Sequence, residues 1–168
     1  EEEYVMAFDS FLKLDGVPGE SVRSGFEGWI EIYSFSMGAS NPTSIGTSGQ
    51  GAGAGKVSLS GFNFMKKTDA ASPKMFQMCC DGKHFPKASL VLNKAGGDKS
   101  LSYLKYDFTE VFVESIQWSG ASGGDDTPAE SVSLVFGSVN VTYTPQKADG
   151  SPGSPVIAGW NLKTNAKT

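Results

Sequence analysis

The residues of this sequence that could do chemistry are a glycine-rich segment ending in lysine, one histidine, two adjacent cysteines and scattered carboxylates. Residues 41–56, NPTSIGTSGQGAGAGK, end in Gly55-Lys56, as a phosphate-binding loop does. That motif requires a glycine where Gln50 stands and a serine or threonine where Val57 stands. A strand pattern follows, so no helix N-terminus would face a phosphate. Nucleotide binding is therefore not expected.

His84 is the only histidine, and no cysteine or histidine spacing supplies partners for a metal site or a catalytic triad. Cys79 and Cys80 lie among Met and Phe residues, where thiols usually fill a core. Adjacent cysteines do not form an ordinary long-range disulfide. A chain of this size without a disulfide framework fits a reducing compartment. We expect neither a metal nor a cofactor.

The carboxylates carry no recognisable pattern either. A glycosidase needs two of them at a defined separation, and no motif selects a pair among Asp9, Glu31, Asp107, Glu110 and Glu114. Asp125, Asp126 and Glu130, which we place in a glycine-rich loop, lack EF-hand spacing. Asn140-Val141-Thr142 matches a glycosylation sequon inside a predicted strand. No catalytic constellation results, so the chain is expected not to be an enzyme.

Composition excludes further classes. The 168 residues carry a net charge of −4, whereas nucleic-acid binding needs clustered Lys and Arg. No apolar run approaches the roughly 20 residues of a membrane span, and the start, EEEYVMAF, is not that of a signal peptide. Gly, Ser, Val, Phe and Tyr are abundant, which favours β-structure.

Alternating patterns predict the elements that must position these residues. We expect one short helix that begins with Ser72 as N-cap and Pro73 in first place and stops at Gly82. Its only solvent stripe is Lys74, Gln77 and Asp81. Strands are expected over 4–14, 28–40, 57–65, 84–94, 101–118, 131–144 and 156–162, with breaks after Phe108 and at Gly137.

These elements show no βαβ rhythm and no repeats, so the fold class is mainly β. We expect one domain over residues 1–168, an antiparallel two-sheet β-barrel or sandwich with the short α-helix packed against it. Within 28–40, Tyr33, Phe35 and Met37 alternate with Ser34 and Ser36. This strand should therefore have one apolar face and one small, hydroxylated face.

The glycine-rich segment 41–56 is much longer than the usual connection of about 4–6 residues. It holds one large aliphatic residue, Ile45, and no charge before Lys56. It cannot bury enough surface alone to offset roughly 1–2 kcal/mol of ordering entropy per residue. We expect another chain to order it.

Several segments together resemble one family, in order and over nearly the whole chain. They are FLKLDGVPGES, GWIEIYSFSMGAS, GAGAGKVSLSGFNFMK, TDAASPKMFQMCCDGKHFPKASLVLNKAGG, VNVTYTPQKADG and GWNLKTN. The family is Hcp (haemolysin-coregulated protein), the tube subunit of the bacterial type VI secretion system.

The resemblance implies hexameric rings that stack into a tube, which sheath contraction exports and whose lumen holds effector proteins. Partners would be the chain itself, effectors, and sheath and spike proteins, and the protein would stay in the bacterial cytoplasm until it is secreted without a signal peptide. The matching stretch implies that Ser36, together with Ser34, faces the lumen. An extended loop in contact with a neighbouring subunit or ring would use residues of 41–56: Thr43, Ser44, Ile45, Thr47, Ser48, Gln50 and Lys56.

Two alternatives remain open. A monomeric β-barrel ligand-binding module would have a concave pocket with convergent polar groups. A small hydrolase would need a nucleophile and a base, which the sequence does not pair. Oligomeric mass separates the first alternative from a tube subunit, and an activity screen separates the second.

Overall fold

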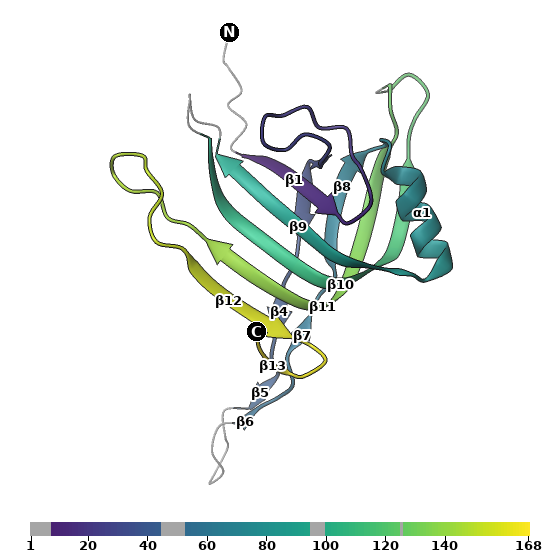
Figure 1. Ribbon diagram of the computed structural model, residues 1–168. Coiled ribbons are helices and arrows are strands. Elements are labelled where there is room, and N and C mark those ends of the chain that lie inside the picture. The colour runs from purple at the N-terminus through teal and green to yellow at the C-terminus, as the bar shows by residue number, and fades with distance from the viewer. Residues whose placement is uncertain (1–7, 45–52, 95–99, 125) are drawn as a thin grey trace.

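The computed structural model describes residues 8–44, 53–94, 100–124 and 126–168, and Figure 1 shows a curved antiparallel sheet with one helix at its side. The mainly-β prediction with one short helix is confirmed. In chain order the elements are β1 (Asp9–Leu14), β2 (Ile30–Ile32), β3 (Ser34–Ser36), β4 (Ala39–Ser40), β5 (Thr43–Ser44), β6 (Gly53–Ala54), β7 (Ser58–Leu59), β8 (Phe62–Lys67), α1 (Ser72–Asp81), β9 (His84–Lys94), β10 (Leu101–Ser119), β11 (Ala129–Tyr143), β12 (Val156–Asn161) and β13 (Ala166–Lys167).

The main sheet runs in the order β13-β12-β11-β10-β9-β1-β2, and every pairing in it is antiparallel. The 15-residue strand β11 pairs with β8 along its first half and with β12 along its second half. β3 then pairs with β8. The segment 30–36 therefore pairs with β1 through β2 and with β8 through β3.

The predicted strand over 28–40 is three short strands instead. At Tyr33 the chain changes neighbours, because β2 pairs with β1 while β3 pairs with β8. The Tyr33 N–H donates to the Met65 carbonyl at 2.8 Å, and the Tyr33 side chain is left exposed. A second break at 37–38 precedes β4.

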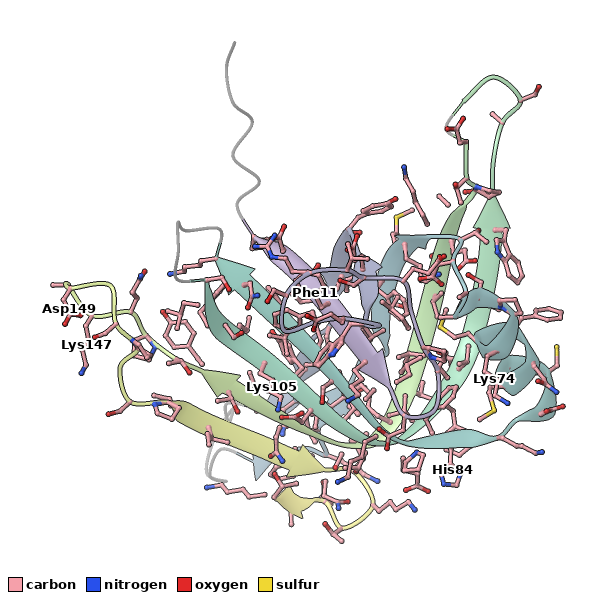
Figure 2. The ribbon with its side chains drawn as sticks, turned by 45° about the horizontal axis from the view of Figure 1, so that its top comes forward. Phe11, Lys74, His84, Lys105, Lys147 and Asp149 are labelled. Carbon is pink, nitrogen blue, oxygen red and sulfur yellow. The ribbon has the colours of Figure 1, made fainter. Side chains whose placement is uncertain are left out.

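The core lies inside the curve of this sheet. Phe62 is at its centre, with its ring centroid 5.5 Å from that of Phe64 and 5.2 Å from that of Phe108. All three rings are buried because these residues alternate with polar ones along β8 and β10. Outside the sheet, the segment between β1 and β2 covers Phe11, whose ring stacks on Phe26 at 4.4 Å (Figure 2).

Near the expected breaks, β10 and β11 are irregular in one row across three strands, although the register between them does not shift here but between Val113 and Ser115. Glu110 lies opposite Pro86 of β9 on one side and Gly137 of β11 on the other. Glu110 adopts a left-handed φ of 52°, and a Cβ on Gly137 would meet the Glu110 carboxylate at 2.9 Å. Along β10, the alternation of buried and exposed side chains shifts by one residue at this row, so that Phe108 before it and Val111 after it are both buried. Each half of this long strand therefore contributes side chains to the core.

The helix differs from its prediction at the start. Pro73 is in the first turn and Gly82 ends the helix with φ of 66°, as predicted. The N-cap residue is Ala71 rather than Ser72, and it makes no side-chain cap. The Ser72 hydroxyl accepts hydrogen bonds from the Lys66 ammonium and the Asp69 N–H instead, both at 3.0 Å. That buried polar contact overrides the local capping preference.

Three further expectations need correction. Cys80 and Phe76 are exposed, and of the apolar side chains expected to fill the core from α1, only those of Met75 and Met78 are fully buried. The expectation that Cys80 fills the core is therefore wrong. Glu130 lies buried in β11 rather than in a loop. β13 was not predicted. Residues 4–7 of the first predicted strand lie outside the described residues. In the part of the chain that the structure describes, no helix has the length and apolarity to cross a membrane.

Candidate interaction surfaces

Eight uncharged residues in two rows form a face on the outer side of β3, β8, β11 and β10, and the exposed Glu114 carboxylate borders it, accepting a hydrogen bond from the Ser133 hydroxyl at 3.1 Å. We call the eight residues the serine face. One row is Ser34, Met65, Ser131 and Gln117, and the other is Ser36, Asn63, Ser133 and Ser115. Residues paired across antiparallel strands point to the same side. All eight are exposed except Ser133, which is half-buried.

The serine face follows from strand alternation. Phe35 lies between Ser34 and Ser36 and packs against the core, with its ring 5.9 Å from Phe62. Phe64 and Val132 point inward between the face residues of their own strands. The predicted division of the 33–37 stretch into an apolar and a hydroxylated face is therefore confirmed for Ser34 and Ser36, which lie on the solvent side. Their assignment to a lumen stays a prediction.

The glycine-rich segment forms a hairpin arm at its described ends, which Figure 1 shows extending away from the sheet. β4 pairs with β7, and β5 pairs with β6 through Thr43–Ala54 and Ser44–Gly53. The Gly55 N–H donates to the Pro42 carbonyl at 2.8 Å, and a Cβ at Gly55 would lie 2.6 Å from that oxygen. The chain therefore orders the base of this segment itself, which differs from the expectation that only another chain orders it.

Of the residues predicted to contact a neighbouring subunit, Thr43 and Ser44 lie in β5, and Thr43 and Lys56 are exposed. Ile45, Thr47, Ser48 and Gln50 lie outside the described residues. A two-stranded hairpin alone is marginally stable in water. At the base of the arm, Gly38 and Ser60 exchange two hydrogen bonds, and Leu59 of β7 packs against the core.

The first half of β10 and the second half of β11, with β12, carry an apolar face that is covered only in part, where the Tyr106 ring lies 5.9 Å from that of Phe35. We call it the wing face. Its rows are Leu104-Tyr143-Val156 and Tyr106-Val141-Ala158. The next row begins with Phe108 and Val139, which are buried, so the wing face continues the core outward. Burial raises the pKa of Tyr106, which keeps this face uncharged over a wider pH range.

Exposure on the wing face increases toward its edge. Tyr143 is 45% exposed and Val156 is 65% exposed. On the other side of β12, Ile157 is 64% exposed among the polar neighbours Lys105 and Thr142. A strand with both faces open gains little from burial in a single chain.

A second apolar patch lies at the opposite flank. The rings of Phe76 on α1 and Trp118 on β10 are 5.6 Å apart and are 48% and 40% exposed. Figure 1 shows α1 and β12 at opposite sides of the molecule, and in Figure 2 Lys74 and Asp149 mark the same two flanks. A heterologous interface needs two different patches placed in this way.

A buried polar network, which the sequence analysis missed, fastens α1 to the sheet. The Lys66 ammonium contacts Glu130 and Asp69, each at 2.8 Å, and the Glu130 carboxylate accepts from the Trp118 indole at 2.5 Å. Lys66 and Glu130 are completely buried. The available signal was the period-2 spacing of Phe62, Phe64 and Lys66, which puts Lys66 on the same side of β8 as the two phenylalanines.

The chemical groups considered first do not converge. In the described residues no three His, Cys, Asp or Glu side chains are placed to hold a metal. His84 is exposed and its ring lies 5.3 Å from Phe112. Glu110 is paired with Lys163, and Asp9 is paired with Arg23. These carboxylates serve as ordinary ion-pair partners.

One hollow of about 610 Å³ lies beside β1 and β2. Asp9, Arg23 and Glu31 are its charged residues, and Phe11, Ile32 and Tyr33 contribute apolar surface. The Asp9–Arg23 ion pair, at 3.2 Å, uses the hollow's one cation. This is the feature that a ligand-binding module would use.

Comparisons with known proteins agree with each other. The family model described as "Type VI secretion system effector, Hcp" matches residues 11–143. The chain is 41% identical to Protein hcp1 of Pseudomonas aeruginosa over 96% of this chain and 99% of that protein. A solved type six secretion system protein matches with a TM-score of 0.91 and 37% identity, over 96% of this chain and all of that one. Hcp1 from Salmonella typhimurium matches with a TM-score of 0.76 and 35% identity, over 97% of this chain and all of that one.

Proposed function

The chain belongs to the Hcp family of type VI secretion proteins, and we propose that it is the structural subunit of the secreted tube. The family is one of secreted structural proteins and is not a known enzyme family. The observation that carries the proposal is the wing face, where a strip of apolar residues that continues the core ends at the 65% exposed Val156. An apolar strip that is exposed in the single chain is expected in a subunit of a closed assembly, because a neighbouring copy buries it.

Ring formation would use the two apolar patches. The wing face of one copy packs against the Phe76–Trp118 flank of the next, head to tail, and closure gives a homohexamer. The two patches lie on opposite sides of the subunit (Figure 1), which suits a ring rather than a twofold dimer. Aromatic residues such as these are enriched at protein interfaces.

The serine face would then line the channel. Its eight residues have hydroxyl or amide side chains and one methionine, and the Glu114 carboxylate borders it at Ser133. The eight residues themselves repel protein cargo of neither charge. Weak contacts repeated around a ring hold one cargo molecule by avidity. The cargo would be type VI effector proteins, carried from the bacterial cytoplasm when a contracting sheath drives the tube out together with its spike.

The hairpin arm would connect neighbouring copies in the stack. It extends from the sheet, its described residues are uncharged except Lys56, and glycines at 53 and 55 permit close backbone approach. Thr43, Ser44 and Lys56 are the described residues that would make this contact, and backbone pairing along the arm would need no particular partner side chain.

The lumen assignment is tested by Ser36→Gln, which enlarges one side chain of the serine face without entering the core. Rings of the variant should have the same mass as wild-type rings and should retain less effector. Ser154→Gln, at another exposed serine outside this face, is the matched control. Unchanged effector retention in intact Ser36→Gln rings would mean that Ser36 does not face the channel.

The rival function is a monomeric ligand-binding module that uses the hollow beside β1. It predicts a single-chain mass at every concentration and loss of binding in Arg23→Ala. The tube subunit predicts a ring whose mass does not depend on Arg23.

A further inference from the structure

Met65 is the one long apolar side chain on the serine face. Its partners across the sheet are Ser34 on β3 and Ser131 on β11, both of them short. Directly paired Cβ atoms lie about 4.5–5.5 Å apart, so the methionine extends beyond its two paired neighbours. It is 43% exposed.

No other methionine of the described chain is available in this way. Met75 is completely buried, Met78 is 8% exposed, and Met37 packs against the core. Met65 does not contribute to the core either, because its strand turns Phe64 and Lys66 inward. Neither packing nor a hydrogen bond of its side chain accounts for a large thioether at this position.

We propose that Met65 is the residue by which the serine face binds protein cargo, through contact with an apolar side chain that the cargo exposes. This inference rests on the proposed function, because it places the serine face in the channel. Methionine is unbranched and polarizable and adapts to differently shaped apolar partners. Surrounding serines and amides discriminate little among cargo surfaces, so the methionine supplies most of the apolar contact.

Assembly multiplies this contact. Each ring would place one Met65 per subunit around the channel, so a cargo with several exposed apolar side chains meets several methionines at once. The class of ligand is therefore a folded protein or an extended segment with apolar side chains separated by small polar ones. A strongly charged surface without such side chains would bind weakly.

The test uses two fluorescein-labelled Gly/Ser peptides of equal length, one with a central leucine and one with serine at that place. Binding to purified rings is followed by fluorescence anisotropy, after light scattering has shown that each variant forms rings. We expect the leucine peptide to bind wild-type and Met65→Leu rings alike. Met65→Ser should weaken this binding about tenfold, which corresponds to about 1.4 kcal/mol, and should not change binding of the serine peptide.

Two controls make each outcome decisive. Val22→Ser removes an apolar side chain that is 90% exposed but lies outside the serine face, and it should leave binding unchanged. Ser36→Gln narrows the channel and should weaken binding of both peptides. If Ser36→Gln weakens binding and Met65→Ser does not, the role of Met65 is wrong while the channel assignment stands. If neither variant changes binding, or wild-type rings bind neither peptide, the serine face is not the cargo surface. An equal loss in Val22→Ser would also overturn the proposal.

Discussion

Lys66 and Glu130 form an ion pair in which both side chains are completely buried, with 2.8 Å between Nζ and Oε2. Asp69 and Ser72, at the start of α1, complete the donors and acceptors around the ammonium, and Trp118 donates to the other oxygen of Glu130. The pair therefore joins β8, β11 and β10 to the helix. Desolvation of both charges is tolerable only because every polar atom has a partner.

Removal of one charge should be far more costly than removal of both. Lys66→Met leaves Glu130 buried without its cation and should lower the free energy of unfolding by about 3–5 kcal/mol. Lys66→Met combined with Glu130→Gln keeps an acceptor for Trp118 and should recover a large part of that loss. Urea unfolding followed by tryptophan fluorescence measures both. A double variant that is less stable than the Lys66→Met single variant would contradict this account.

Glu110 provides a test of the sheet break. Its φ of 52° is in the region where a side chain costs about 1–2 kcal/mol relative to glycine. Glu110→Gly should therefore be more stable than Glu110→Ala by about 1 kcal/mol, although both lose the ion pair with Lys163. At Thr109, an ordinary strand position, glycine should be the less stable substitution. If the glycine variant were also less stable than the alanine variant at Glu110, as at Thr109, the backbone at Glu110 would not be strained.

The wing face predicts an unusually selective effect on assembly. Val156→Asp and Tyr143→Asp place a carboxylate in the proposed subunit interface and should dissociate the ring, because an unpaired buried charge is very unfavourable. Ile157→Asp is the matched control, since Ile157 is equally exposed on the same strand but points to the other face. Sedimentation velocity gives the masses. Dissociation by Ile157→Asp alone would place the interface on the opposite face.

Asp149 predicts a local pH dependence. Its carboxylate accepts hydrogen bonds from the Ser151 hydroxyl at 2.6 Å and the Ser151 N–H at 3.0 Å, and these hold the pKa of Asp149 below its ordinary value. Since the folded-state pKa is lowered, the stabilisation is present above the ordinary carboxyl pKa and is lost as the pH falls through the lowered value. Carboxyl-carbon NMR titration should show the pKa rise in Ser151→Ala and stay constant in Ser154→Ala.

Local patterns were sufficient for the long elements. β9 spans His84–Lys94 as predicted, and β10 and β11 differ by a few residues, because period-2 alternation over more than ten residues has no competing interpretation. Ser34 and Ser36 could be placed on one face for the same reason. The position of Gly82 followed from its own chemistry as a helix stop.

What failed depended on contacts distant in sequence. The division of 28–40 at Tyr33 arises because its two halves pair with β1 and β8, and no pattern within the segment shows that. Ser72 was predicted to be the N-cap from its residue type and its place before Pro73, whereas its contact with Lys66 depends on how α1 packs on β8. The position of Met65 between Ser34 and Ser131 could not be predicted either, because it depends on the pairing of β8 with β3 and β11.

The most direct test of the tube subunit is the mass of the purified protein in solution, measured by multi-angle light scattering, with negative-stain images of the same sample. We predict a mass of six chains, or multiples of it where rings stack, and annular particles with an open centre. A single-chain mass at high concentration would contradict ring formation and would leave the wing face and the serine face without the partners assigned to them.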